Sequence, residues 1–136
     1  MKTLVTLTLI VALTFLLMNY TKSSPAQHES RTITRIWRGW TSKENADKFQ
    51  KTLADEAIPS IESNKPKGCL GIQVLRRETG EEVEFTTIML FNSLSAIKEF
   101  AGEDYEAAHI DPKVKPLLLR YDGRVVHHET LFAKVW

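Results

Sequence analysis

The sequence is poor in several features that define common protein classes. Its 136 residues include one cysteine, Cys69, so no disulfide can form within the chain. The first 26 residues hold two of the 18 basic residues and no acid, which leaves 16 basic and 17 acidic residues in the remainder. This balance gives no support for nucleic-acid binding, which requires a basic face. No Gly-rich phosphate loop, Ser-His-Asp order or Cys/His cluster is present either.

Long apolar runs are also scarce, and the longest lies at the N-terminus. Uncharged, mainly apolar residues fill Leu4 to Met18 after Lys2, and a polar stretch follows. This order of basic, apolar and polar regions is typical of a secretory signal. The run is about 15 residues long, whereas roughly 20 span a bilayer comfortably.

We therefore expect residues 1–26 to form a signal peptide or membrane anchor, with cleavage after Ala26 as one possible outcome. Residues 27–31 are expected to be a linker. The protein is then exported, to the periplasm or the exterior, or it stays membrane-anchored if the signal is not cut. Contact with a membrane is expected only through this N-terminal segment.

Alternation, apolar spacing and turn residues predict six elements in the rest of the chain. Ser42 and Ser93 are expected to cap the two helices, Pro59 to kink or end the first near Ile58, and Gly102 to close the second. The predicted elements are a strand at Thr32–Thr41, a helix with the face Ala46, Phe49, Leu53, Ala57 and Ile61, strands at Leu70–Arg77 and Glu82–Phe91, a helix with the face Leu94, Ile97, Phe100 and Ala101, and a strand at Tyr121–Phe132.

The resulting β-α-β-β-α-β order predicts an α+β, ferredoxin-like sandwich over residues 32–132, with a C-terminal tail at 133–136. Both helices then cover one face of an antiparallel sheet. The predicted strand Glu82–Phe91 has apolar residues on both faces, including Phe85 on one and Ile88 on the other. A sheet face that is apolar but has no helix needs another cover, and a symmetric homodimer through this face is the simplest solution.

Three segments resemble the antibiotic biosynthesis monooxygenase (ABM) superfamily, and its small members in particular. They are Arg35–Gly39 (RIWRG), Gly80–Phe85 (GEEVEF) and Phe100–Tyr105 (FAGEDY). The resemblance implies a dimeric α+β barrel in which two sheets pack face to face, with a pocket in each subunit between sheet and helices. Some members oxidise aromatic polyketides with O₂ and without metal or cofactor, related members bind and degrade haem, and others have no known chemistry.

Trp37 and Arg38 are candidate site residues on the first predicted strand. Alternation sends Arg35 and Trp37 to one face and Arg38 and Trp40 to the other. An indole facing the helices can line an aromatic pocket and donate its N–H, and a nearby arginine can stabilise an enolate or phenolate. The alternative is that Trp37 belongs to the core and Arg38 to the surface or an interface.

His109 and Tyr105 are further candidates, because they follow the second predicted helix. A neutral His109 imidazole can act as a general base, and the resemblance also puts it where haem-degrading relatives hold iron. Those relatives further use an asparagine on the first strand and a tryptophan on the second helix, where this chain has Arg38 or its neighbours and Phe100. Tyr105 is expected to donate a proton or to cap the pocket mouth, and an exposed loop position remains open for His109.

No metal or cofactor is expected. His127 and His128 are adjacent on a predicted strand and point to opposite faces, so the two cannot chelate one ion. Cys69 is expected to be a small packing residue rather than a nucleophile.

The leading functional expectation is a cofactor-independent monooxygenase of the ABM type, acting on a small aromatic or readily oxidised substrate. In it His109 takes a proton, and Trp37 and Arg38 position the anion that reacts with O₂. The alternatives are a non-catalytic dimeric envelope protein that binds a small hydrophobic ligand or a partner, and a haem-binding or haem-degrading relative.

Overall fold

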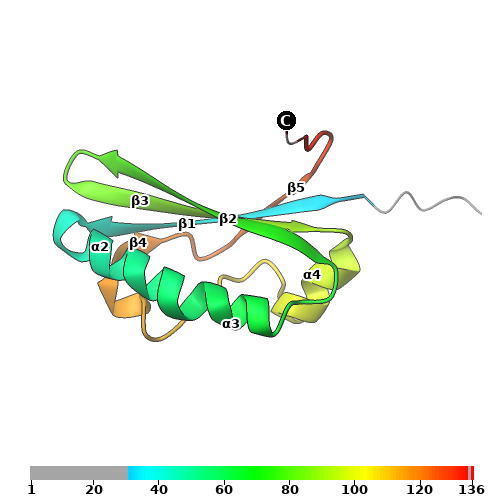
Figure 1. Cartoon of the computed structure of the whole chain (residues 1–136), viewed down its shortest axis with the longest axis horizontal. Coiled ribbons are helices and arrows are strands. Elements are labelled where there is room, and N and C mark those ends of the chain that lie inside the picture. Colours follow the sequence, from blue (N-terminus) through cyan, green and yellow to red (C-terminus); the bar gives the residue numbers. More distant parts are fainter. Residues whose placement is uncertain (1–30, 135) are drawn as a thin grey trace, which may run out of the picture.

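The computed structural model describes residues 31–134 and 136, which form one antiparallel sheet with helices on one side (Figure 1). The predicted signal or anchor at 1–26 and the linker up to residue 30 lie outside the described residues. Within the described part, no helix is long and apolar enough to cross a membrane. The elements are β1 (Ile33–Ser42), α2 (Lys43–Thr52), the π-helical turn η1 (Leu53–Ala57), α3 (Ile58–Ser63), β2 (Cys69–Thr79), β3 (Glu82–Phe91), α4 (Leu94–Ala101), the 3₁₀ turn η2 (Lys115–Leu117), β4 (Leu118–Tyr121) and β5 (Val126–Glu129).

The strand order is β2-β3-β1-β4, and β5 also pairs with β1. β1 pairs with β3 over ten residues, from Ile33 opposite Phe91 to Ser42 opposite Glu82. Gly80 has a φ of 71° in the turn between β2 and β3, a conformation that L side chains rarely adopt. This order confirms the ferredoxin-like α+β fold with its antiparallel sheet.

The first helical segment does not end near Ile58; its regular α-helical pattern is instead interrupted by η1, directly before Ile58 and Pro59. Ser42 caps α2 by accepting a hydrogen bond from the Asn45 backbone N–H. In η1 the N–H of Ile58 bonds to the carbonyl of Leu53, five residues back. Pro59 then lies in the first turn of α3, where its missing N–H is tolerated, so the helix continues to Ser63.

The second helix matches its predicted ends. The Ser93 side chain accepts a hydrogen bond from the Ala96 N–H, and Gly102 ends the helix with a φ of 84°. Ile97 and Ala101 are buried, while Phe100 keeps 39% of its surface exposed.

The predicted last strand, Tyr121–Phe132, is wrong in its bounds. Two short strands, β4 and β5, pair with β1 instead, and residues 122–125 leave the sheet between them. The reason is a competing set of backbone hydrogen bonds: Ala108 N–H donates to the Gly123 carbonyl at 3.0 Å, and Val125 N–H to the Glu106 carbonyl at 2.8 Å. Residues 122–125 thereby bind the segment 106–108, which follows α4.

The core lies between the sheet and the helices and is divided into two clusters at opposite ends. Between them the helix-covered face carries smaller side chains, such as Thr87 on β3 between Phe85 and Met89. The first cluster contains Ala46, Phe49, Val83, Phe85 and Val114, and the second contains Met89, Phe91, Ala96 and Ile97.

Candidate functional site

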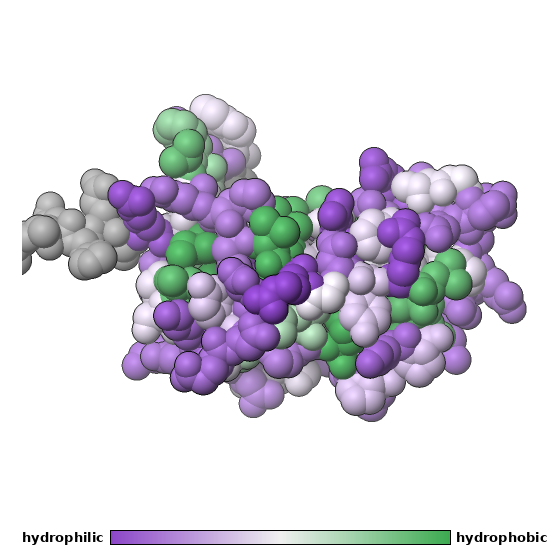
Figure 2. Space-filling view, turned by 180° about the vertical axis from the view of Figure 1, so that it is seen from behind, coloured by the Kyte–Doolittle hydropathy of each residue, from purple (hydrophilic) through white to green (hydrophobic). Residues whose placement is uncertain are grey.

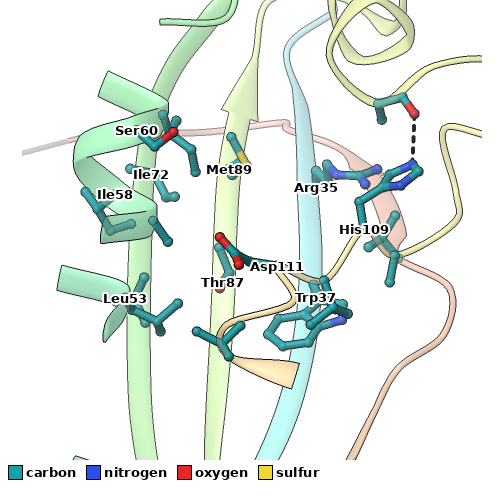
Figure 3. Close-up of a pocket in the computed structure, with 18 of the residues that line it drawn as sticks. Arg35, Trp37, Leu53, Ile58, Ser60, Ile72, Thr87, Met89, His109 and Asp111 are labelled. Carbon is teal, nitrogen blue, oxygen red and sulfur yellow. Dashed lines mark hydrogen bonds between the residues drawn. The ribbon is translucent and has the colours of Figure 1, made fainter. Parts of the chain in front are cut away.

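An open cavity of about 380 Å³ lies between the two core clusters, bounded by the sheet, the η1–α3 segment and the loop after α4 (Figure 3). This volume falls in the range of small-molecule sites. Members of both clusters line it, among them Phe49 and Met89. The polar side chains on its walls are those of Arg35, Ser60, Thr87, His109 and Asp111.

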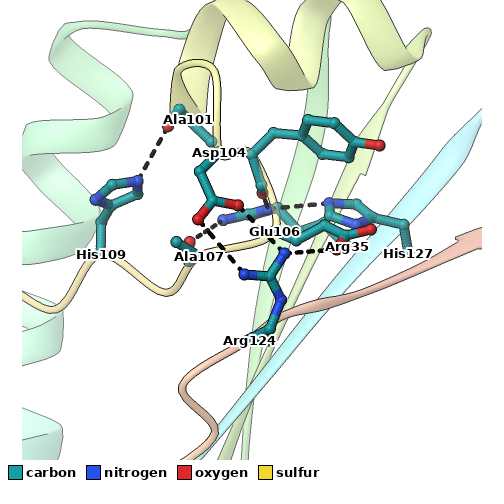
Figure 4. Close-up of polar contacts among 9 residues, drawn as sticks. Arg35, Ala101, Asp104, Glu106, Ala107, His109, Arg124 and His127 are labelled. Carbon is teal, nitrogen blue, oxygen red and sulfur yellow. Dashed lines mark hydrogen bonds and ion pairs between the residues drawn. The ribbon is translucent and has the colours of Figure 1, made fainter.

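Arg35 is the one charged side chain that the fold buries here, with 7% of its surface exposed. It projects from β1 on the helix side of the sheet. Its Nη1 donates to the Tyr105 carbonyl and contacts His127 Nε2 at 2.9 Å, and its Nη2 approaches the Ala107 carbonyl at 3.5 Å (Figure 4). Burial lowers the pKa of Arg35 from its ordinary value, but a guanidinium stays charged at neutral pH.

His127 lies opposite Arg35 in the β1–β5 pairing. Burial first, and then the Arg35 charge, lower the pKa of His127 below its ordinary value, although Glu106 opposes the shift. The imidazole is therefore neutral at neutral pH. Because Arg35 can only donate, His127 Nε2 accepts, and the proton of the neutral ring is on Nδ1.

Tyr105 supports this cluster and does not line the cavity. Its ring packs edge-on against His127 with 5.4 Å between the ring centroids. The ammonium of Lys98 lies 5.4 Å from the centre of the Tyr105 ring. The backbone carbonyl of Tyr105, rather than its hydroxyl, is the group that contacts Arg35.

His109 lies in an exposed loop position, as one alternative predicted, and it also lines the cavity. Its Nε2 is 3.0 Å from the carbonyl oxygen of Ala101, the last residue of α4. A carbonyl can only accept, so Nε2 carries the proton in this contact and Nδ1 of the neutral ring has a free lone pair. The side chain is thus oriented by α4 and retains one basic nitrogen.

Trp37 also lines the cavity, but its N–H is already used. Nε1 donates to the Asp122 carbonyl at 3.0 Å, so the indole contributes an apolar wall and no donor to the cavity. The neighbouring glycine makes room for this ring. A Cβ at Gly39 would lie 2.6 Å from Cη2 of Trp37 and 2.9 Å from Cδ2 of Leu118.

Arg38 does not reach the cavity. It points to the opposite, open face of the sheet, where its Nε donates to the Asp122 carboxylate at 2.9 Å and its guanidinium lies 5.5 Å from the Trp40 ring. Of the four predicted site residues, the structure brings His109 and Trp37 to the cavity and leaves Arg38 and Tyr105 outside its lining.

Sequence reasoning missed Arg35 and His127 as members of this site. The alternation of β1 puts Arg35 on the same face as Trp37, so a signal for Arg35 was present. The contact of Arg35 with His127 depends on the pairing of β5 with β1, which no local pattern indicates.

Cys69 and the described metal-binding side chains add no further site. Cys69 is half-buried at the start of β2 and packs against the second core cluster. Among residues 31–134 and 136, no group of three or more His, Cys, Asp or Glu side chains is arranged to hold a metal ion.

No protein-family model and no curated protein sequence matches the chain. Solved structures do. Two of them are each described as a "putative antibiotic biosynthesis monooxygenase". The one from Bacillus cereus is 15% identical, with a TM-score of 0.55, over 78% of this chain and 97% of that chain. The one from Caulobacter crescentus is 23% identical, with a TM-score of 0.54, over 75% and 92% of the two chains.

A third similar structure is that of the haem degrader MhuD from Mycobacterium tuberculosis, with two haems bound in its active site. It is 23% identical, with a TM-score of 0.52, over 76% of this chain and 99% of that chain. At these identities the likeness concerns the fold alone. The chain therefore has the ferredoxin-like α+β fold that is found in structures described as antibiotic biosynthesis monooxygenases.

Proposed function

We propose that the protein binds a small aromatic or readily oxidised molecule in the cavity beside His109 and oxidises it with O₂, without a metal or organic cofactor. The observation that carries this proposal is the orientation of His109. Its ring lies on the wall of an apolar cavity, and the Ala101 carbonyl leaves Nδ1 as the free basic nitrogen. The shared fold with the ABM structures supports the same reaction class.

In this reaction His109 Nδ1 takes a proton from an acidic CH₂ group of the substrate and leaves an enolate or phenolate. The anion passes one electron to O₂, and the resulting radical and superoxide join to form a C–O bond. The peroxide then takes the proton back and loses water. The balance is that a CH₂ group and O₂ give a carbonyl group and water.

The other cavity residues set the environment of this step. The apolar walls, including Trp37, contact the body of the substrate, and the positive charge of Arg35 favours formation of the anion over the neutral substrate.

Oxygen uptake by the full chain with anthrone, whose CH₂ group becomes a carbonyl in anthraquinone, tests this proposal. We expect His109→Gln to lower the turnover about 100-fold, the lower range for loss of a general base. His128→Gln is the matched control, because His128 is exposed on the open sheet face. Equal turnover by His109→Gln and the wild type would reject His109 as the base.

Binding without chemistry is the second candidate, and the mainly apolar lining of the cavity favours it. In this case apolar molecules stabilise the protein to heat and no O₂ is consumed with any of them.

Haem fits the described residues less well. The Nε2 atom of His109 is occupied by the Ala101 carbonyl, and the neighbouring position on α4 is Phe100. Titration with haem, followed by absorbance, tests this directly. A saturable absorbance change that His109→Ala abolishes would favour haem over the O₂ reaction described above.

The open sheet face supports a homodimer. It carries Ile36, Leu75, Ile88, Leu90 and Val126, with Leu75 50% and Val126 48% exposed. In Figure 1 the C-terminal segment rises on this same side of the sheet. Light scattering during gel filtration is expected to give the mass of two chains, and Ile88→Glu to give the mass of one.

We further propose that residues 1–26 direct export. Mass spectrometry of the protein isolated from its cells distinguishes the two forms. A first residue at Gln27 indicates a cleaved signal, and an intact N-terminus indicates an anchor.

A further inference from the structure

We propose that the ligand of this cavity is an organic carboxylate with an apolar body, and that its carboxylate pairs with Arg35. The inference deepens the proposed function, because it names the substrate class of the same cavity. It rests on that function only for the chemical step, since binding of a carboxylate can be measured without turnover.

The first argument is the pairing of the arginines. The structure describes seven of them, and six form an ion pair with an acid within 3.3 Å. Arg35 is the one described arginine without an acidic partner, and it is the buried one. This is the reverse of the usual pattern, in which exposed charges go unpaired and buried charges are matched. The six paired residues are Arg31, Arg38, Arg76, Arg77, Arg120 and Arg124.

The second argument is that every contact of the Arg35 guanidinium is with a neutral group. Two backbone carbonyls and the neutral His127 ring accept from it. The acid closest to this cluster in the chain, Glu106, is engaged by Arg124 at 2.7 Å (Figure 4). A buried charge with only neutral partners keeps much of its desolvation cost, which an anion from outside the chain would offset.

Arg35 also has unused N–H donors beside the cavity. Arg35 has five N–H groups, and its contacts with Tyr105, His127 and Ala107 use three of them. The Nε N–H and one Nη2 N–H have no acceptor among the described residues. Arg35 lines the cavity, and Figure 3 shows it pointing toward His109 across the cavity wall. Two adjacent donors of a guanidinium fork match the two oxygens of a carboxylate.

The rest of the cavity defines the body of the ligand. Most lining residues are apolar, and a volume of about 380 Å³ at about 30 Å³ for each water-sized group holds on the order of a dozen non-hydrogen atoms. Asp111 is a second charged group on the wall, and it is negative. A monocarboxylate with one or two rings fits this combination, and its carboxylate would lie at Arg35 rather than at Asp111.

A purely structural role for Arg35 makes a different prediction. In that case the guanidinium only ties the Tyr105–Ala107 segment to β1, and the protein does not discriminate between a carboxylate and a neutral analogue. The discrimination by the wild-type chain is therefore the central measurement, and it requires no substitution that could impair folding.

Calorimetric titration of the full chain with three carboxylates and their amides tests the proposal: benzoate, 1-naphthoate and octanoate against benzamide, 1-naphthamide and octanamide. We expect at least one carboxylate to bind about 30-fold more tightly than its amide, the loss typical when a buried charge is left without its partner. Equal affinities within all three pairs, or no binding by any of the six compounds, would overturn the proposal.

Arg35→Met and Arg38→Met form a matched pair of variants. They remove the same side chain from the same strand, three residues apart and on opposite faces. Arg35→Met is expected to reduce carboxylate affinity to that of the amide, and Arg38→Met to leave it unchanged. If Arg35→Met does not fold, Arg35→Lys is the second variant, because lysine keeps the positive charge but lacks the two parallel N–H donors of a guanidinium. It is expected to weaken binding of the carboxylate and to leave binding of the amide unchanged.

Oxygen uptake separates this inference from the proposed function. If carboxylates bind in an Arg35-dependent way but no ligand causes O₂ consumption, the anion site is supported and the oxidation is rejected. Oxidation of neutral substrates, together with equal affinities for the carboxylates and their amides, would leave the oxidation and reject the anion site.

Discussion

Arg35 and Arg38 lie on opposite faces of β1 and have opposite surroundings. On the helix-covered face Arg35 is buried beside an apolar cavity and contacts only neutral groups. On the open face Arg38 pairs with Asp122, and Arg120 pairs with Glu82 while its guanidinium lies 3.8 Å from the centre of the Trp40 ring. The covered face also carries Arg76, but it pairs with Asp47 of α2, so Arg35 is the described arginine whose charge no acid offsets.

This difference separates stability from function. The ion pairs of the open face are partly exposed, so each adds little to the free energy of unfolding. Their arginines also cover the Trp40 ring, which is only 7% exposed. On the covered face no acid offsets the desolvation of Arg35, but its hydrogen bonds to the Tyr105 and Ala107 carbonyls hold the loop after α4 against β1. On the side of the molecule shown in Figure 2 the surface is mainly hydrophilic, with separate apolar patches.

The largest predicted difference between the faces is in packing. Phe85→Ala is expected to lower the free energy of unfolding by about 3–5 kcal/mol, because Phe85 is 1% exposed and its ring packs 4.7 Å from that of Phe49. Ile88→Ala, three residues away on the open face, should cost about 1 kcal/mol in the single chain. Urea unfolding followed by circular dichroism measures both.

A cost for Ile88→Ala that rises with protein concentration would show that the open face is covered by a second chain. A cost for Phe85→Ala as small as that for Ile88→Ala would contradict the division of the sheet into a packed face and an open face.

Most of the fold could be predicted from the sequence because its signals are local. Ser42 and Ser93 cap helices as expected, and the bounds of β3 match the predicted strand. The last strand could not be placed, because residues 122–125 pair with residues 106–108, which are far away in the sequence. The continuation of the helix through Pro59 depends on a π-helical turn that propensity rules do not anticipate.

The candidate site was only half predictable, for a similar reason. His109 and Trp37 were found because their residue types and positions on single elements indicate a pocket. Choosing between Arg35 and Arg38 required knowing which face of β1 the helices cover and which acids meet each arginine. Asp122 lies in the segment between β4 and β5, so its contact with Arg38 depends on the tertiary structure.

The second prediction compares the two arginines by stability. Arg35→Ala is expected to lower the free energy of unfolding by about 2–3 kcal/mol, because it leaves the Tyr105 and Ala107 carbonyls without their donor. Arg38→Ala removes a partly exposed pair and should cost less than about 1 kcal/mol. Thermal and urea unfolding of both variants measure the difference, and a larger loss in Arg38→Ala would reverse the comparison.

The third prediction concerns pH and the partner of Arg35. The pKa of His127 is lowered in the folded protein, by burial and then by Arg35, so the unfolded chain binds the His127 proton first as the pH falls. The contribution of His127 to stability is therefore complete above about pH 6.5 and is lost as the pH falls toward the lower, folded value.

His127→Gln keeps an acceptor for Arg35 and removes the titration, so its unfolding free energy should fall less than that of the wild type between about pH 7 and pH 5. His128→Gln, at the neighbouring histidine on the other face, is the matched control; it should keep most of the wild-type pH dependence, because His128 is the smallest of the causes that lower the pKa of His127. Identical pH profiles for His127→Gln and the wild type would contradict a neutral, buried His127.

The smallest predicted effect concerns the Arg38–Asp122 ion pair on the open face, and it tests whether this exposed pair contributes little to stability. Asp122→Asn removes the carboxylate that pairs with Arg38 but keeps the backbone carbonyl that accepts from Trp37. The side chain of Arg38 is 49% exposed, so we expect a loss of about 0.5 kcal/mol or less at low salt. At about 1 M salt, where charges are screened within about 3 Å, the loss should vanish. A loss of several kcal/mol that salt leaves unchanged would mean that the open face holds its arginines as tightly as the covered face holds Arg35.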